Sequence, residues 1–141
     1  MEWPNVELRR SFYRVLNGRD VDALVALCHP SVEVRSSFAA VGGATYQGHE
    51  GVRRWMRDTE ESWGGSFRVE PDAFYEIGEH TMILGVLKAR GSHSGLEVAM
   101  PAIGVARWRD GLCASHKGYV DKSDALDELG VSEEALEPIK P

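Results

Sequence analysis

The sequence predicts an α+β domain in which a curved antiparallel β-sheet wraps around N-terminal helices and encloses a cone-shaped pocket. Two observations carry this prediction. Apolar residues recur mainly at helical spacing up to residue 63 and alternate as in strands from residue 66 onward. The segments between the expected strands are short and rich in turn-forming residues. Helices followed by a run of strands are typical of a sheet that carries its helices on one face.

Three helices are expected before the main sheet. Asn5 can cap the first helix, which Gly18 ends. Asp20 can cap the second, and Pro30 stops it. Residues 45–63 form the third, because their apolar side chains recur at helical spacing until a glycine pair follows. The residues that define the stripes of the first and third helices are Leu8, Phe12, Val15, Leu16, Val52, Trp55, Met56, Thr59 and Trp63.

Five strands are expected. VEVRSSF at residues 32–38 alternates like a strand and precedes a loop, AVGGAT at 40–45. Four more strands follow, and short turns make them antiparallel neighbours. They are SFRVEPDAFYEI (66–77), HTMILGVLKARG (80–91), LEVAMPAIGVARWR (96–109) and LCASHKGYVD (112–121). We assign residues 1–129 to one domain and residues 130–141 to a short C-terminal tail.

The strand PAIGVARW has unusually small residues on one face. Ala102, Gly104 and Ala106 alternate with larger residues and leave space above that face. We expect this space to be ligand volume, so that leucine at position 104 would fill the pocket and leave the fold intact. The alternative is that another side chain, such as Trp55, already packs there. The change would then overpack the core.

The opposite face of the same strand is apolar. Ile103 and Val105 lie there beside Pro101. An apolar patch on a monomer marks an interaction surface. We therefore expect a homodimer formed through the sheet.

Composition excludes several functions. A net charge of −6 and a pI near 5.3 argue against nucleic acid and membrane as partners. The chain shows neither a signal-peptide pattern nor an apolar membrane span, so we expect a cytoplasmic protein.

Cys28 and Cys113 are far apart and are expected to be reduced, packed thiols. The five histidines form no ligand-type pair, and we expect neither a metal nor a cofactor.

Several segments together resemble the SnoaL-like branch of the nuclear transport factor 2 superfamily. They are FYRVLNGRDVDALVALCHPSVEV (12–34), YQGHEGVRRWM (46–56), WRDG (108–111) and YVDKSDAL (119–126). The resemblance spans the chain from about Val6 to Leu129 and implies an α+β cone with a deep pocket and a dimer. The family includes steroid isomerases, polyketide cyclases, epoxide hydrolases and binding proteins without a reaction, so it implies a fold more than a function.

The positions that would carry acid-base groups in related enzymes hold other residues here. By resemblance, the isomerase tyrosine falls on Phe12 and its general-base aspartate on Ser36. The pocket acid or histidine falls on Gly104, and the aspartate of the epoxide hydrolases falls on Gly118. A one-residue slip of this match would reverse the face of a strand.

His116 and Asp121 are the remaining catalytic candidates. His116 shares the face of Gly118, and an imidazole titrates near neutrality, although a wall histidine is the alternative. Asp121 could instead cap the following helix. Tyr46 could bring a hydroxyl to the pocket or pack as an aromatic residue. The expected pocket-lining residues are Phe12, Ser36, Tyr46, Trp55, Trp63, Ala102, Gly104, Ala106 and Gly118.

The leading hypothesis is a protein that binds a small hydrophobic or aromatic molecule in the cone, with no reaction assigned. The alternative is an isomerase, polyketide cyclase-type or hydrolase enzyme that uses His116 as its acid-base group. A third possibility is a dimerisation or partner-binding module whose cone is filled by its own side chains. A carboxylate beside His116 would favour the enzyme, and a filled cone would favour the module.

Overall fold

A computed structural model describes residues 3–37 and 44–141 of the chain. The helices are α1 (Pro4–Asn17), α2 (Val21–Ala26), α3 (Gly48–Trp63) and α4 (Lys122–Leu129), with single 3-10 turns η1 (Gly64–Ser66) and η2 (Glu133–Ala135). The strands are β1 (Cys28–Ser36), β2 (Ala44–Gln47), β3 (Arg68–Ile77), β4 (His80–Arg90), β5 (Glu97–Arg109) and β6 (Leu112–Tyr119). This arrangement confirms the α+β class.

The six strands form one sheet in the order β2-β1-β6-β5-β4-β3. The four strands from β3 to β6 are antiparallel neighbours, as the short turns predicted. Asp110 and Gly111 both have positive φ (56° and 76°) in the β5–β6 turn. Two such residues make a type I′ hairpin, whose twist matches that of the strands it joins. The Arg-Asp-Gly sequence therefore joins β5 to β6 directly, and a shift in register between Arg107 and Trp108 then sets the pairing of the pocket face.

The expectation of a wholly antiparallel sheet is wrong at one position, because β1 runs parallel to β6. Strands β2 to β5 and helix α3 lie between β1 and β6 in the sequence, so no hairpin fixes their relative direction. The pairing aligns Cys28 with Cys113 and Val34 with His116. It therefore brings the first strand beside the strand that carries the catalytic candidate.

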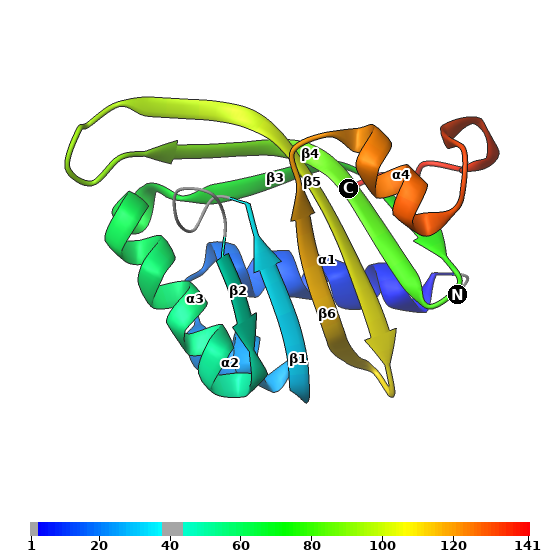
Figure 1. Ribbon diagram of the computed structural model, residues 1–141, viewed down its shortest axis with the longest axis horizontal. Coiled ribbons are helices and arrows are strands. Elements are labelled where there is room, and N and C mark those ends of the chain that lie inside the picture. The colour runs from blue at the N-terminus through cyan, green and yellow to red at the C-terminus, as the bar shows by residue number, and fades with distance from the viewer. Residues whose placement is uncertain (1–2, 38–43) are drawn as a thin grey trace.

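The bent sheet and its helices make an open cone (Figure 1). Helix α1 runs across the concave face, and α3 lies beside β1 and β2. The buried residues inside the cone form one core that joins α1 and α3 to the sheet. Representative members are Phe12, Leu16, Val34, Trp55, Phe74 and Leu87. The outer face of β5 carries a second, smaller core beneath α4.

Three expected element boundaries are corrected. Helix α1 is capped at Trp3 and has Pro4 in its first turn, where the fixed φ of proline suits a helix start, so Asn5 is not the cap. Helix α2 ends at Ala26, and the chain from Cys28 already belongs to β1. The first three residues of the expected third helix, 45–47, belong instead to strand β2, which is too short to show alternation. Phe38 and most of the expected 40–45 loop lie outside the described residues.

The reason given for a dimer is also corrected. Ile103 and Val105 are only 8% and 5% exposed, because helix α4 packs Ala125 against them. The patch is therefore covered by the chain itself. Helix α4 supplies this cover, since its few apolar residues all face the sheet.

The C-terminal segment packs on the same body. The backbone of Ile139 exchanges two hydrogen bonds with Phe74 of β3, at 2.8 and 2.7 Å. The Lys140 carbonyl accepts a hydrogen bond from Arg10 Nη2 at 2.8 Å, and Leu136 packs against the outer core. These contacts cover part of the edge strand β3, where unpaired backbone groups would otherwise face solvent.

Candidate functional site

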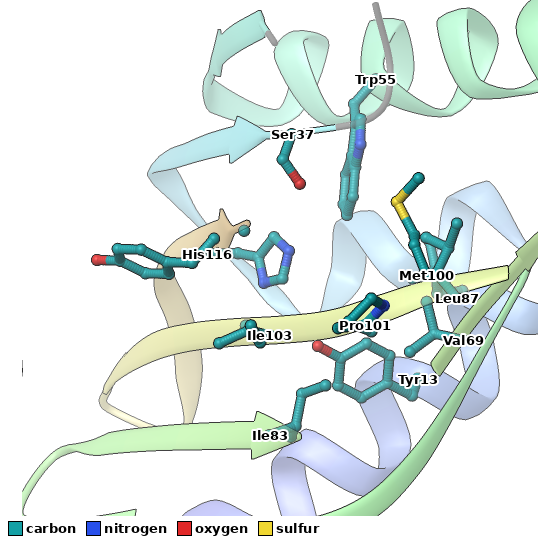
Figure 2. A pocket seen from close by; sticks show the side chains of 15 residues that line it. Tyr13, Ser37, Trp55, Val69, Ile83, Leu87, Met100, Pro101, Ile103 and His116 are labelled. Carbon is teal, nitrogen blue, oxygen red and sulfur yellow. The ribbon is translucent and has the colours of Figure 1, made fainter. Parts of the chain in front are cut away.

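A narrow cavity lies inside the cone between the sheet and helices α1 and α3 (Figure 2). The volume of this cavity is only about 30 Å³. That free space accommodates about two water molecules. The walls are mainly apolar, with side chains from Leu16, Val69, Ile83, Leu87, Met100 and Ala102. The polar side chains in the lining are those of Tyr13, Ser37, His116 and Tyr119.

Three aromatic rings form a stack at one side of the cavity. The ring of His116 lies 5.4 Å from that of Trp55 and 5.2 Å from that of Phe12, at interplanar angles of 30° and 32°. Trp55 points from α3 toward the cavity, and His116 reaches it from β6 (Figure 2). Both line the cavity, whereas Phe12 packs behind them in the core. Such a wall suits the flat face of an aromatic ligand.

His116 is buried and lacks the partner that an acid-base catalyst needs. Burial, and then the positive charge of Arg9, hold the pKa of His116 well below its usual value. Its Nδ1 has no hydrogen-bond partner among the described residues. The described lining of the cavity contains no carboxylate that could orient the imidazole. His116 therefore sits in the cavity as a neutral ring.

The small residues of β5 line the cavity only in part. Ala102 and Gly104 belong to the lining, as does Gly118 on β6. Ala106 is fully buried in the core and does not belong to the cavity lining. A Cβ atom on Gly104 would lie 2.8 Å from both Arg9 Nη2 and Tyr13 Oη. Protein side chains therefore fill the space above Gly104, and they are not Trp55.

On helix α1, Tyr13 and not Phe12 brings an aromatic hydroxyl group to the cavity. By resemblance, Phe12 stands where related isomerases have a tyrosine, and its ring is buried in the core. Tyr13, the next residue of α1, lines the cavity (Figure 2). Burial raises the pKa of the Tyr13 phenol, although the charge of Arg9 opposes that effect. The hydroxyl is therefore a neutral donor and acceptor at the cavity wall.

Arg9 is the residue that the sequence analysis missed. Its side chain is fully buried, with the guanidinium carbon 4.8 Å from the Phe12 ring centre and 4.7 Å from that of Tyr13. Its Nε, Nη1 and Nη2 have no hydrogen-bond partner among the described residues. The available signal was spacing, because Arg9 is three residues from both Val6 and Phe12 on the buried stripe of α1. The stripe expected from the sequence contains the half-buried Leu8 and omits Arg9.

The other candidates lie away from the cavity. The Tyr46 hydroxyl donates a 2.6 Å hydrogen bond to Asp58 on α3, and burial together with this bond raises its pKa to about 12. Ser36 was expected to line the pocket. It is buried, whereas its neighbour Arg35 is exposed, but it is not part of the described cavity lining. Trp63 is half-buried at the end of α3, packed against the inner core.

Asp121 serves as a helix cap. Its side chain accepts hydrogen bonds from the backbone N and the hydroxyl of Ser123, at 3.4 and 3.2 Å, at the start of α4. It is exposed and lies outside the described cavity lining. This placement agrees with the capping alternative and gives Asp121 no contact with the cavity.

The two cysteines, distant in the sequence, meet in the sheet. Cys28 and Cys113 are register partners in the parallel β1–β6 pair, and both are free and buried. A hydrogen bond to Cys113 and burial raise the pKa of the Cys28 thiol. Cys113 Sγ also lies 3.4 Å from the Ser115 carbonyl, to which its S–H donates. The pair lies in the inner core and outside the described cavity lining.

Two other features are absent from residues 3–37 and 44–141. No cluster of three or more histidine, cysteine or acidic residues could hold a metal ion there. No helix of the same residues is long and apolar enough to cross a membrane.

Known structures resemble this fold closely. An NTF2-like protein of unknown function from Burkholderia pseudomallei K96243 has a TM-score of 0.75 at 22% identity, over 88% of this chain and 95% of that one. TerC co-crystallised with polyporic acid has a TM-score of 0.73 at 24% identity, over 89% and 97% of the two chains. RV0760c from Mycobacterium tuberculosis, in complex with estradiol-17β-hemisuccinate, has a TM-score of 0.70 at 16% identity, over 85% and 95%.

The sequence itself also identifies a family. A search of curated proteins finds no match to this chain. The model of the SnoaL-like domain, in contrast, matches residues 9–116, which include α1 from Arg9 onward, helix α3 and the cavity face up to His116. These residues make up more than half of the chain, and the bent sheet around α1 agrees with the match. The chain therefore belongs to the SnoaL-like family.

Proposed function

We propose that this protein binds a small hydrophobic or aromatic molecule in the cavity of the cone. The observation that carries the proposal is the cavity wall, in which the Trp55 and His116 rings face aliphatic side chains such as Ile83 and Leu87. Apolar walls with a few polar groups are typical of small-molecule sites. Two related structures, with polyporic acid and estradiol-17β-hemisuccinate, hold ring compounds and support the same ligand class.

The small free volume sets a condition on binding. About 30 Å³ is far less than a ring requires, so side chains must move when a ligand enters. Met100 is suited to this, because its unbranched side chain is 40% exposed at the cavity and changes conformation easily. We propose that displacement of Met100 opens the cavity.

Binding without chemistry is favoured over the enzyme alternative. An acid-base role for His116 requires a group that orients the imidazole, and the described residues place no carboxylate beside it. Its lowered pKa also leaves it uncharged at neutral pH, so it has no proton to donate as an imidazolium. The small free volume of about 30 Å³ is the observation that favours the module alternative, which predicts that no small molecule enters the cone.

A nuclear magnetic resonance (NMR) titration with neutral aromatic fragments (phenol, indole and benzamide) tests the proposal. We expect at least one fragment to shift the backbone amides of Gly104 and Gly118, which line the cavity. Ala102→Leu should abolish these shifts by filling the cavity. Ala99→Leu is the matched control, because Ala99 is exposed on the opposite face of the same strand. Absence of any shift at millimolar concentrations would favour the module alternative.

We further propose that the protein is a cytoplasmic homodimer associated through its sheet. Since α4 covers Ile103 and Val105, the remaining apolar surface of that face is the distal part of β5 and β4. Pro101 is exposed there and is paired with the half-exposed Val86. Two free thiols as register neighbours fit a reducing compartment.

A further inference from the structure

The buried guanidinium of Arg9 has no counter-ion in the described part of the chain. Arg9 takes part in no ion pair between described residues, and its three nitrogen atoms lack hydrogen-bond partners there. A guanidinium carries five N–H donors and no acceptor, so each donor needs an external acceptor. Burial of an unpaired charge is strongly unfavourable, and such a charge is normally retained only with a partner.

The contacts with aromatic rings do not supply that partner. The guanidinium carbon lies 4.8 Å from the ring centre of Phe12 and 4.7 Å from that of Tyr13. Cation–π attraction uses the faces of the rings and stabilises the charge. It offers no lone pair in the plane of the guanidinium, where the N–H bonds point. The donors of Arg9 therefore remain without acceptors.

The unpaired donors lie at the wall of the cavity. Arg9 Nη2 and Tyr13 Oη both lie 2.8 Å from the position that a Cβ atom would occupy on Gly104. Gly104 and Tyr13 line the cavity, so Nη2 lies directly behind its wall. A second orphan donor belongs to the same cavity, because the Nε1 of the lining residue Trp55 has no partner among the described residues. The groups around the cavity therefore offer donors and positive charge without a matching anion.

We propose that the ligand of this cavity is an organic acid whose anionic group, a carboxylate or an acidic enol or phenol, is bound by Arg9 and Tyr13. The inference rests on the proposed function and specifies its ligand class. The ring of such a ligand lies against Trp55 and His116, and its charged oxygen accepts from Arg9 and from the Tyr13 hydroxyl. Displacement of the Arg9 and Tyr13 side-chain ends toward the cavity would bring their donors to the ligand.

Cys113 is the nearby group that could compete as a counter-ion. Its thiol lies close enough to Arg9 for the positive charge to favour the thiolate, after the larger effect of the hydrogen bond from Cys28. The 3.4 Å contact in which its S–H donates to the Ser115 carbonyl requires the protonated thiol. Arg9 therefore remains without an anion when Cys113 is protonated.

The test compares benzoate with benzamide, which have the same shape but differ in charge. Isothermal titration calorimetry of the full-length protein should give a dissociation constant for benzoate about 10- to 100-fold lower than for benzamide. In Arg9→Met the two constants should become equal, because methionine fills similar space without charge. Arg9→Met should also raise the melting temperature of the ligand-free protein by several degrees, since an unpaired buried charge is removed.

Control variants separate this role from packing. Arg14→Met removes an exposed arginine of the same helix and should keep the preference for benzoate. Arg9→Lys keeps the charge but loses the planar array of N–H donors, so it should keep part of the preference for benzoate. Cys113→Ser should leave the preference for benzoate unchanged. A large gain in benzoate affinity in Cys113→Ser would assign the counter-ion to the thiolate and overturn the inference.

The outcomes distinguish this inference from the proposed function. Equal binding of benzoate and benzamide to the wild-type protein would overturn the inference and leave aromatic binding intact. If the wild-type protein binds neither benzoate nor benzamide, both the inference and the proposed function are overturned. If Arg9→Met does not fold, the NMR signal of the Arg9 Nε–H in the wild-type protein provides the test. This signal should shift when benzoate is added and should not shift with benzamide. The same response to both compounds would contradict the inference.

Discussion

Replacement of Gly104 by alanine tests whether the space above the strand is occupied. A Cβ atom at this position would lie 2.8 Å from Arg9 Nη2 and from Tyr13 Oη, and 3.3 Å from His116 Cε1. The first two distances are shorter than real Cβ contacts, so both side-chain ends must move. The structure therefore favours the overpacking alternative over an empty space at this position.

The size of the effect follows from two opposing terms. Overpacking of a core costs about 1–3 kcal/mol, whereas Gly→Ala gains about 0.4–1 kcal/mol because the unfolded chain is restricted. The free energy of unfolding should therefore fall by up to about 2.5 kcal/mol, which corresponds to a loss of up to roughly 10 °C in Tm for a chain of this size. Leucine at this position should destabilise the protein further, since the cavity has little free volume.

Chemical denaturation of Gly104→Ala, Gly65→Ala and the wild-type protein measures this difference. Gly65 is the matched control, because no atom lies within 4 Å of a Cβ there and its backbone conformation suits alanine. In a Tyr13→Phe background, which lacks the crowded hydroxyl, Gly104→Ala should cost about 0.5–1 kcal/mol less. A Gly104→Ala protein as stable as Gly65→Ala would refute the placement of Arg9 and Tyr13.

Three further predictions concern other parts of the molecule. The folded pKa of His116 lies below its unfolded value near 6.5, so the unfolded chain binds the extra proton as the pH falls. The unfolding free energy should decrease below about pH 6.5 by up to roughly 1.4 kcal/mol per pH unit relative to His116→Gln, and parallel denaturation profiles would contradict this. Tyr46→Phe removes the hydrogen bond to Asp58 and should cost about 1–3 kcal/mol in urea denaturation, while no loss would show the bond to be unimportant. Light scattering at micromolar concentration should give twice the mass of 15.6 kDa, and a monomer mass would exclude the dimer.

Sequence reasoning predicted the parts of the fold that depend on local signals. Turn residues between β3, β4, β5 and β6 determine hairpins, and Asp110-Gly111 is a clear example because both residues adopt positive φ. The parallel pairing of β1 with β6 has no such signal, since distant segments meet only after the sheet forms. The contact between Cys28 and Cys113 depends on that pairing and was equally hidden.

The candidate site was predictable only in part. Trp55, His116 and the small residues of β5 follow from helical spacing and alternation, and they line the cavity apart from Ala106. Arg9 does not follow, because an arginine at a stripe position usually extends its charge to solvent. Whether it does so here depends on the depth of the cone, which no local pattern encodes.

The position of a bound ring tests the central claim most directly. Isotope-filtered NMR with saturating benzoate should show nuclear Overhauser effects (NOEs) from the ring protons to methyl groups that line the cavity. We expect them at Ile83 and Leu87 of β4 and at Val69 of the neighbouring strand β3, all of which line the cavity. NOEs confined to exposed residues such as Val120, or no intermolecular NOEs at all, would contradict ligand binding inside the cone.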